Sequence, residues 1–448
     1  MIRPHYYNEY KSRQCREIFR SIGSKAGFEM KRRLFESLSV TPNLFEAFQL
    51  RQVRKILLHA VRTTDYWRSV FSNIAVNGFS DIPDFEAFET LPVLTRAFMK
   101  KWGTSMFLSG TVPDTRRVFA YTSGSTGEPY GFYQDKREFP IRRWDVLYGL
   151  RLNGIRVHGP AIILGLRTHL YLEPLGVMVE NLGDEKTLRD VLYPAIEKLK
   201  PKVIFCTPSA LRMLKAHLEQ DGRKIFFETI DCAGEKLDED EREVFSRFFC
   251  SRISTWYGTR EIGPIAVECL LGSYHLLPWS NYIEIVNSEG RPLRFGQEGC
   301  VVATSFSNFA MPFIRYNAGD RGMLVQDVCK CGSRIPVLVL KGRLPEVITT
   351  PSGKSFSVAG FGTEIAKRFA VTILQFQLVE EKPGFYTFRF VPGRKYEPGL
   401  DTPLLDMLRN IIGQKSIIAL EKVSGISPNA SGKTPTFLRE TNLNGKHE

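Results

Sequence analysis

Short β-rich runs alternate with helical stretches between Arg117 and Gly234. The β-rich runs read RVFAYTS, PAIILGL, KVIFCT and FFETIDCAG. A polar helical segment is expected at residues 137–151, and further helices are expected at residues 187–200 and 209–219. Strand–helix–strand repetition with short connections is typical of α/β architecture with largely parallel sheets. After Tyr282 the pattern becomes hairpin-like, as in NYIEIVNSEGRPL and EGCVVATSF, and predicts a β-rich subdomain. The sequence therefore predicts an α/β fold with a helical start.

The chain is too long for one ordinary domain. It has 448 residues, whereas single hydrophobic cores stop growing at about 250–300 residues. We expect a large domain made of a helical N-terminal region (1–100) and a core (101–342), followed by a small α+β domain (343–448). Within the small domain the run ILQFQLVEEKPGFYTFRFV predicts a β-hairpin. A periodic stretch at residues 45–71 predicts a helical apolar face that includes Phe48, Val53 and Ile56.

The chain is basic, with 61 Lys and Arg against 48 Asp and Glu. The first sixty residues carry much of this excess. A solvated basic face is the simplest interpretation, and peripheral contact with anionic lipid is the alternative. No recognised nucleic-acid module is present, no apolar run reaches the ~20 residues needed to span a bilayer, and the first residues lack a signal-peptide core. We expect a cytoplasmic protein without a nucleic-acid partner, and the oligomeric state stays open.

A loop rich in glycine and hydroxyl residues, YTSGSTGEP, follows a predicted strand and ends at Pro129. Glycines allow close backbone approach, and the hydroxyls add donors, so the loop can wrap phosphate oxygens. It lacks the Gly-Lys-Ser/Thr ending of a P-loop and the G-x-S-x-G spacing of a serine hydrolase. By itself such a loop is more often a surface turn.

The loop is one of six motifs in a fixed order. The others are CAGE (Cys232–Glu235), WYGTREIGP (Trp256–Pro264), RYNAGD (Arg315–Asp320), KGR (Lys341–Arg343) and SGK (Ser431–Lys433). Together they resemble the adenylate-forming superfamily of acyl-CoA synthetases, nonribosomal-peptide adenylation domains and luciferases. The closest likeness is to the phenylacetate–CoA ligase branch, which includes the CapK-like proteins.

The resemblance implies an AMP-forming ligase with a mobile C-terminal domain. A carboxylic acid would be activated by ATP and Mg²⁺ as an acyl-adenylate, pyrophosphate would leave, and CoA is the expected acyl acceptor. Two alternatives stay open: an adenylyl- or acyltransferase acting in surface-polysaccharide biosynthesis without CoA, and an inactive adenylate-fold binding protein. An aryl or other hydrophobic acid is the first expectation, bound by residues 148–175 and around Ala233 and Gly258. His158, Arg167 and His169 would also suit a sugar acid.

The resemblance also assigns roles to residues. Lys433 would bridge the substrate carboxylate and the α-phosphate, Glu261 would hold Mg²⁺, and Thr259 would touch the α-phosphate. Asp320 would bind the ribose hydroxyls, and Arg343 would lie near the same sugar. Two larger sets complete the nucleotide site: the phosphate-covering residues Thr122, Ser123, Gly124, Ser125, Thr126 and Gly127, and the adenine-lining residues Ala233, Gly234, Glu235, Trp256, Tyr257 and Gly258.

Two departures from the family pattern concern the phosphate loop and the hinge. Tyr130 stands where many relatives end the phosphate loop with lysine, although the phenylacetate branch commonly lacks that lysine. Arg343 is followed by Leu344, Pro345 and Glu346 instead of a run of acidic residues, and proline restricts backbone rotation. We therefore expect any departure from the family reaction in the domain swing and the CoA step.

Four Cys and His residues follow directly on two of these motifs. Cys269 and His275 come after WYGTREIGP, and Cys329 and Cys331 come after RYNAGD. Three thiolates and one imidazole can satisfy a tetrahedral structural Zn²⁺ and leave no open position for substrate. The alternative is four unrelated residues.

Overall fold

The structure is a computed structural model. It describes residues 42–73, 84–121, 130–155, 160–165, 170–179, 187–326, 328–343, 347–351, 353–369, 372–393, 395–426 and 436–439. The chain divides into two compact units, and the first ends at Gly342 while the second contains Arg343–Glu448. In the described part of the chain, no helix combines the length and the apolar character needed to cross a membrane.

Among the described residues, the first unit begins with the α-helices α3 (Pro42–Thr63), α4 (Asp65–Asn73), α5 (Phe85–Glu89) and α6 (Arg96–Trp102). The predicted periodic stretch is therefore helical, but it is broken at Thr64. The Thr64 hydroxyl donates to the Ala60 carbonyl at 2.8 Å. Val53 and Ile56 are fully buried, in keeping with the expected apolar face.

One eleven-stranded sheet runs through the first unit, in the order β10-β11-β12-β13-β9-β8-β7-β6-β5-β3-β4. Its parallel part consists of β4 (Gly176–Val179), β3 (Ala161–Leu164), β5 (Val203–Cys206), β6 (Thr229–Ala233) and β7 (Arg252–Thr259). Antiparallel pairing then joins β7, β8 (Gly263–Glu268), β9 (Tyr274–Leu276) and β13 (Val337–Arg343). The strands β10 (Asn281–Val286), β11 (Glu298–Ser305) and β12 (Tyr316–Val325) are antiparallel as well. The expected β-rich subdomain is thus continuous with the parallel sheet.

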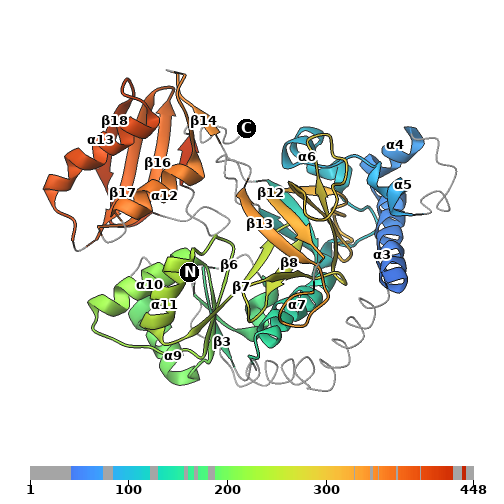
Figure 1. The fold of residues 1–448 in the computed structure, drawn as a ribbon, viewed down its shortest axis with the longest axis horizontal. Helices are drawn as coiled ribbons and strands as arrows, with labels where there is room; N and C mark the ends of the chain where they lie inside the picture. The colour runs from blue at the N-terminus through green and yellow to red at the C-terminus, as the bar shows by residue number, and fades with distance from the viewer. Residues whose placement is uncertain are drawn as a thin grey trace. The chain divides into compact units, whose positions relative to one another are not determined.

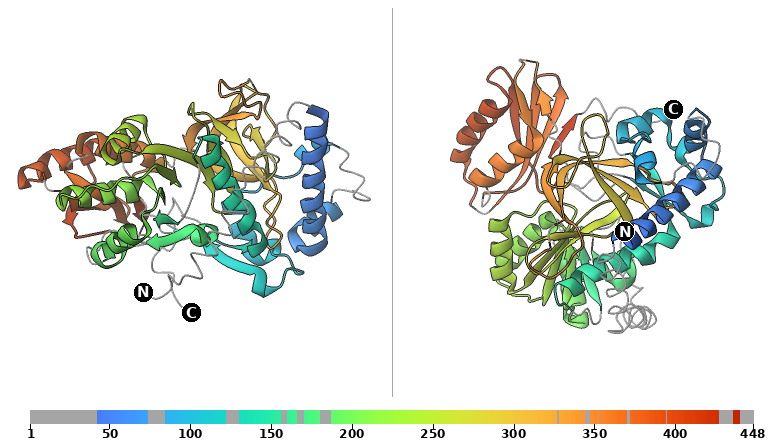
Figure 2. Two further views of the ribbon diagram at one scale, coloured as in Figure 1. Left: turned by 90° about the horizontal axis from the view of Figure 1, so that it is seen from below. Right: turned by 45° about the vertical axis from the view of Figure 1, so that its right-hand side comes forward.

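Helices cover both faces of the parallel strands (Figure 1). On one face, α9 (Tyr193–Leu199), α10 (Pro208–Gln220) and α11 (Glu239–Phe249) pack against alternate strand residues such as Ile230 and Cys232. On the other face lies α7 (Phe139–Leu152), with the 3₁₀ segment Leu170–Leu175 (Figure 2). The sequence suggested a polar helix here, but α7 is buried along most of its length. Its charged residues Arg142, Arg143 and Asp145 lie inside the protein.

Three smaller sheets complete the described structure, two of two strands and one of four strands. β1 (Arg117–Tyr121) and β2 (Gly131–Asp135) form a two-stranded sheet that flanks the phosphate-loop motif. In the second unit, β14 (Val347–Thr349) and β15 (Ser355–Ser357) precede α12 (Val358–Phe369). A four-stranded sheet follows, in the order β18-β17-β16-β19, and α13 (Asp401–Ile412) packs with it.

The hairpin predicted in the second unit is present. β16 (Ile373–Lys382) pairs antiparallel with β17 (Phe385–Pro392). The outer strands β18 (Ile417–Lys422) and β19 (Phe437–Arg439) pair in parallel with β17 and β16. The structure therefore confirms the predicted α/β fold with a C-terminal α+β region.

The contact between α7 and β8 is tight enough to require glycine. A Cβ atom added to Gly149 would lie 2.9 Å from the Val267 side chain. We predict that Gly149→Ala lowers the free energy of unfolding by about 1–3 kcal/mol, because the crowded contact outweighs the better helix propensity of alanine. Urea denaturation of the first unit measures this change. Gly110→Ala is the control, since its added Cβ would meet only the Thr63 carbonyl oxygen, at 3.8 Å. Equal stability of the two variants would contradict the prediction.

Candidate functional site

The predicted nucleotide site includes the phosphate-loop motif, Lys433 and Arg343. Residues Thr122–Gly127 and Lys433 lie outside the described residues, and only the backbone of Arg343, at the end of β13, is described. Their assigned roles stay predictions. The other predicted site residues all lie in the first unit.

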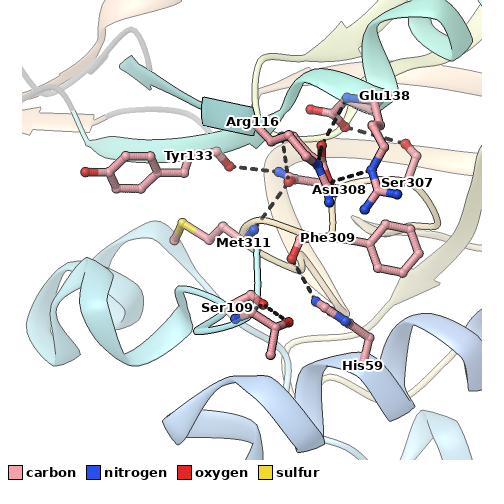
Figure 3. Close-up of polar contacts among 12 residues, drawn as sticks. His59, Ser109, Arg116, Tyr133, Glu138, Ser307, Asn308, Phe309 and Met311 are labelled. Atoms are coloured by element: carbon pink, nitrogen blue, oxygen red, sulfur yellow. Dashed lines mark hydrogen bonds and ion pairs between the residues drawn. The ribbon is translucent and has the colours of Figure 1, made fainter. Parts of the chain in front are cut away.

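The two strands beside the phosphate-loop motif are held together by a buried ion pair. Arg116, just before β1, donates through Nε to Oδ1 of Asp135 at 3.2 Å and also binds Oδ2, and Asp135 ends β2 and is fully buried. Asn308 adds a second connection, because its side chain accepts from the Asp135 and Met311 amides and donates to the Tyr133 carbonyl (Figure 3). The two strands that flank the motif are therefore anchored by a polar network at the ends farther from the motif.

The turn from β7 to β8 carries Thr259 and Glu261. Gly258 is needed at this turn, because an added Cβ would lie 2.3 Å from the Gly263 carbonyl oxygen. The Thr259 hydroxyl accepts a hydrogen bond from the Ile262 amide at 3.1 Å, which closes the turn. Glu261 is only 2% exposed, although it is an acid. Burial also lowers the pKa of the neighbouring Arg260 to about 10.

Two tyrosines join this turn to β12 by a reciprocal exchange. The hydroxyl of Tyr257, on β7, donates to Oδ2 of Asp320 on β12 at 2.7 Å. In return the hydroxyl of Tyr316, on β12, donates to Oε1 of Glu261 at 2.7 Å. Burial, followed by the nearby Glu261 charge, raises the pKa of Tyr316 well above its usual value, so this hydroxyl stays protonated as a donor. The carboxylates predicted to hold Mg²⁺ and ribose are thus fixed relative to each other.

Arg96, at the start of α6, is the cationic partner of Glu261. Its Nη2 lies 3.5 Å from Oε1 of Glu261. The start of α6 is itself attached to β12, because Leu94 donates to the Arg315 carbonyl at 2.9 Å and accepts from the Asn317 amide at 2.8 Å. The Glu261 carboxylate therefore receives a charge partner from the N-terminal region of the chain.

The donor chemistry of Glu261 fits Mg²⁺. Among the described residues, all hydrogen bonds and ion pairs of its side chain involve Oε1, which leaves Oε2 to accept a ligand. A carboxylate oxygen is the kind of hard ligand that Mg²⁺ prefers. The free carboxylate oxygen of Glu261 can therefore accept a divalent cation.

The predicted adenine-lining residues lie at the ends of β6 and β7. Glu235 is occupied by the start of α10, where both the amide and the hydroxyl of Ser209 donate to it, at 3.0 and 2.8 Å. Gly234 has φ +83°, a conformation that favours glycine. Ala233 and Trp256 are buried in the apolar cluster between the sheet and α7, and Trp256 is only 6% exposed. Contact of Trp256 with a nucleotide stays a prediction.

The four predicted zinc ligands come together. The ligand atoms of Cys269, His275, Cys329 and Cys331 all lie within 4.8 Å of one another. The pairing of β9 with β13, which places His275 opposite Val337, brings the two loops side by side. Unrelated residues would have no reason to converge in this way.

The two cysteine turns share one hydrogen-bonding pattern. Cys269 accepts from the Gly272 amide and donates to the Ser273 carbonyl, at 2.9 Å in both cases. Cys329 does the same with Gly332 and Ser333, at 2.8 and 3.1 Å. Both glycines have positive φ, +78° and +87°. The chain therefore repeats one compact turn, which begins at Cys269 in one segment and at Cys329 in the other.

His275 is oriented as a metal ligand would be. Its Nδ1 lies 2.9 Å from the Ile335 carbonyl oxygen, which directs Nε2 toward Cys331 Sγ at 3.3 Å. Burial lowers the pKa of His275, against the opposing effect of the Ile335 hydrogen bond. A neutral imidazole with one nitrogen fixed by a carbonyl is the usual state of a zinc-bound histidine. The donor set and its orientation fit Zn²⁺.

Two residues near Glu261 were not among the sequence candidates. Arg96 gave no signal beyond Thr95, a typical residue to begin a helix. Arg142 gave no sequence signal either, because Arg143 and Asp145 stand close to it in α7 and make the segment look polar.

Comparisons with known proteins agree with this geometry. Residues 161–310 match the model of the AMP-binding enzyme family. The chain is 28% identical to a phenylacetate–coenzyme A ligase of Thermus thermophilus, over 64% of this chain and 67% of that protein. It is 26% identical to the phenylacetate–coenzyme A ligase of Escherichia coli strain K12, over 65% and 69%.

The fold agrees as well. A crystal structure of 2-hydroxyisobutyryl-CoA ligase in the postadenylation state superposes with a TM-score of 0.66, at 14% identity, over 88% of this chain and 89% of that one. Six ordered motifs, the family match and the shared fold lead to one conclusion. Residues 161–310 match the AMP-binding enzyme family, the fold is that of an adenylate-forming CoA ligase, and the chain is an AMP-forming ligase similar to the phenylacetate–CoA ligases.

Proposed function

We propose that this protein activates a carboxylic acid with ATP and then transfers the acyl group to CoA. In the first step a carboxylate oxygen attacks the α-phosphorus and pyrophosphate leaves, giving an acyl-adenylate. In the second step the CoA thiolate attacks the acyl carbonyl and AMP leaves. The observation that supports this proposal most directly is the reciprocal tyrosine exchange, which holds Glu261 and Asp320 at one site.

The candidate site residues would each have a separate role in the proposed reaction. Glu261 would hold Mg²⁺, which supplies charge neutralisation at the phosphates when bound. Asp320 would bind the ribose hydroxyls, and the motif at residues 122–127 would cover the β- and γ-phosphates. Lys433 would place its ammonium group between the carboxylate and the α-phosphate, where charge develops in the transition state.

An aryl or other hydrophobic acid is the proposed substrate class. The cluster between α7 and the sheet is rich in aromatic side chains, with Trp144 stacked on Tyr148 and both rings edge-on to Trp279. The phenylacetate–coenzyme A ligases that the chain resembles take an aromatic acid by name. Transfer to an acceptor other than CoA is the second candidate, favoured by the Leu344-Pro345-Glu346 sequence after Arg343.

We predict carboxylate-dependent ATP–pyrophosphate exchange, and a loss of about 10²–10³-fold in its rate for Glu261→Gln and for Lys433→Ala. The first variant removes the charge that would hold Mg²⁺, and the second removes the cation at the reacting oxygens. The measurement is incorporation of labelled pyrophosphate into ATP across a panel of aryl, aliphatic and sugar acids.

The surface variants Glu219→Gln and Lys415→Ala are the controls and should exchange like the unmodified protein. Consumption of added CoA then separates an acyl-CoA ligase from a transferase with another acceptor. Absence of exchange with every acid tested would contradict the proposed function.

We also propose that Cys269, His275, Cys329 and Cys331 bind one structural Zn²⁺. Four protein ligands complete a tetrahedral shell, so the ion would stabilise the two turns and take no part in the reaction. The shared turn geometry and the orientation of His275 support this proposal.

Removal of this ion should destabilise the first unit. We predict one zinc per chain by elemental analysis, and a melting temperature lowered by about 5 °C or more after chelation or in Cys331→Ser. Cys250→Ser is the matched control, because Cys250 is an exposed thiol outside the cluster, and it should keep both the metal and the melting temperature. Purified protein with no zinc, and with an unchanged melting temperature in Cys331→Ser, would refute the metal site.

A further inference from the structure

We propose that Arg142 is a positioning residue for the carboxylate that holds Mg²⁺, acting with Glu138 through the backbone of the β7–β8 turn. This inference rests on the proposed function, since it takes Glu261 as the Mg²⁺ ligand. It concerns two buried residues outside the six motifs.

The guanidinium of Arg142 binds the turn at two consecutive carbonyl groups. Nη1 donates to the Arg260 carbonyl at 3.0 Å, and Nη2 donates to the Glu261 carbonyl at 2.8 Å. The planar fork of arginine suits such a two-point contact, which a lysine ammonium cannot reproduce. The backbone that carries the Glu261 side chain is thus fixed from α7.

Glu138 holds the guanidinium in this position. Its Oε2 accepts from Nη2 of Arg142 at 3.0 Å, and both side chains are buried, with 0% and 3% exposure. Ser307 lies 3.5 Å from the same oxygen (Figure 3). Burial raises the pKa of Glu138 to about 7, while the Arg142 charge opposes this shift. A buried cation without such a partner would be costly, so the pair is needed to keep Arg142 inside.

The turn is shaped to admit this side chain. Gly263 has φ +93°, and a Cβ added there would lie 2.9 Å from Nε of Arg142. The guanidinium therefore occupies the space that a side chain at residue 263 would need. Glycine at the start of β8 and arginine on α7 are complementary features of one contact.

The Arg260 carbonyl, which Arg142 binds, also connects the turn to the strands beside the phosphate-loop motif. Gln134, on β2, donates from Nε2 to the Arg260 carbonyl at 3.1 Å. Arg142 and β2 thus converge on one backbone atom next to Glu261. If Arg142 no longer bound these carbonyl groups, the backbone that positions the Glu261 carboxylate would be less well fixed. We expect weaker binding of the metal–nucleotide complex as a result.

The test is calorimetric ATP binding with Mg²⁺ and with EDTA, in the absence of any carboxylate substrate. We expect Mg²⁺ to tighten ATP binding by the unmodified protein. In Arg142→Lys the ratio of the ATP affinity with Mg²⁺ to the ATP affinity with EDTA should be about tenfold smaller. Affinity in EDTA should change little. General structural damage would instead weaken binding under both conditions, so the ratio of the two affinities separates positioning from stability.

Arg242→Lys is the matched control. Arg242 also pairs with a buried glutamate, Glu268, at 2.8 Å and donates to the Ile253 carbonyl at 3.2 Å, but it lies on α11 and does not touch the turn. Arg242→Lys should keep the full increase in ATP affinity that Mg²⁺ produces in the unmodified protein. Glu138→Gln provides a second approach if Arg142→Lys does not fold, with an expected loss of about threefold in the same ratio.

The outcomes are distinct. An unchanged Mg²⁺ gain in folded Arg142→Lys, or in Glu138→Gln when Arg142→Lys does not fold, would overturn this inference and leave the proposed function intact. An equal loss in Arg242→Lys would also overturn it. If Mg²⁺ does not tighten ATP binding by the unmodified protein, the assignment of Glu261 fails, and the inference fails with it.

Discussion

Two hydroxyl–carboxylate hydrogen bonds hold the candidate site together. Tyr257 and Glu261 belong to the β7–β8 connection, whereas Tyr316 and Asp320 belong to β12, and three strands lie between β7 and β12 in the sheet. Each segment gives a donor to the other's buried acid. A buried carboxylate without a partner is costly, so neither segment can take up its conformation without the other. The two motifs form one structural element despite their separation in sequence.

Two buried arginines connect these motifs to the surrounding protein. Arg142 pairs with Glu138 and binds the turn, and Arg315 pairs with Glu284 while donating to carbonyl groups of Leu91 and Gly290. In both cases one glutamate neutralises the charge and the remaining donors bind backbone oxygens. Arginine can do this because its several N–H groups point in fixed directions. The site is thus stabilised by cations that need not touch substrate.

The sequence predicted the alternating strands and helices of the parallel part, the C-terminal hairpin and the convergence of four metal-binding side chains. These features follow from local periodicity, or from motifs whose order is informative. Other features depend on tertiary contacts. The segment of α7 was expected to be a polar helix, whereas in the structure it is largely buried and specific partners such as Glu138 bind Arg142 inside the protein. The break at Thr64 and the continuity of the β-rich strands with the parallel sheet likewise have no local signal. Roles assigned to residues 122–127 and to Lys433 stay predictions.

The position of the Cys/His cluster along the chain determines which strands a bound metal would connect. Cys329 and Cys331 directly precede β13, and β13 runs to Arg343, where the second compact unit begins. A metal at the cluster would connect the residues before β13 to the turn after β8. Such a cross-link would strengthen a short strand pairing, since β9 and β13 are matched at His275 and Val337.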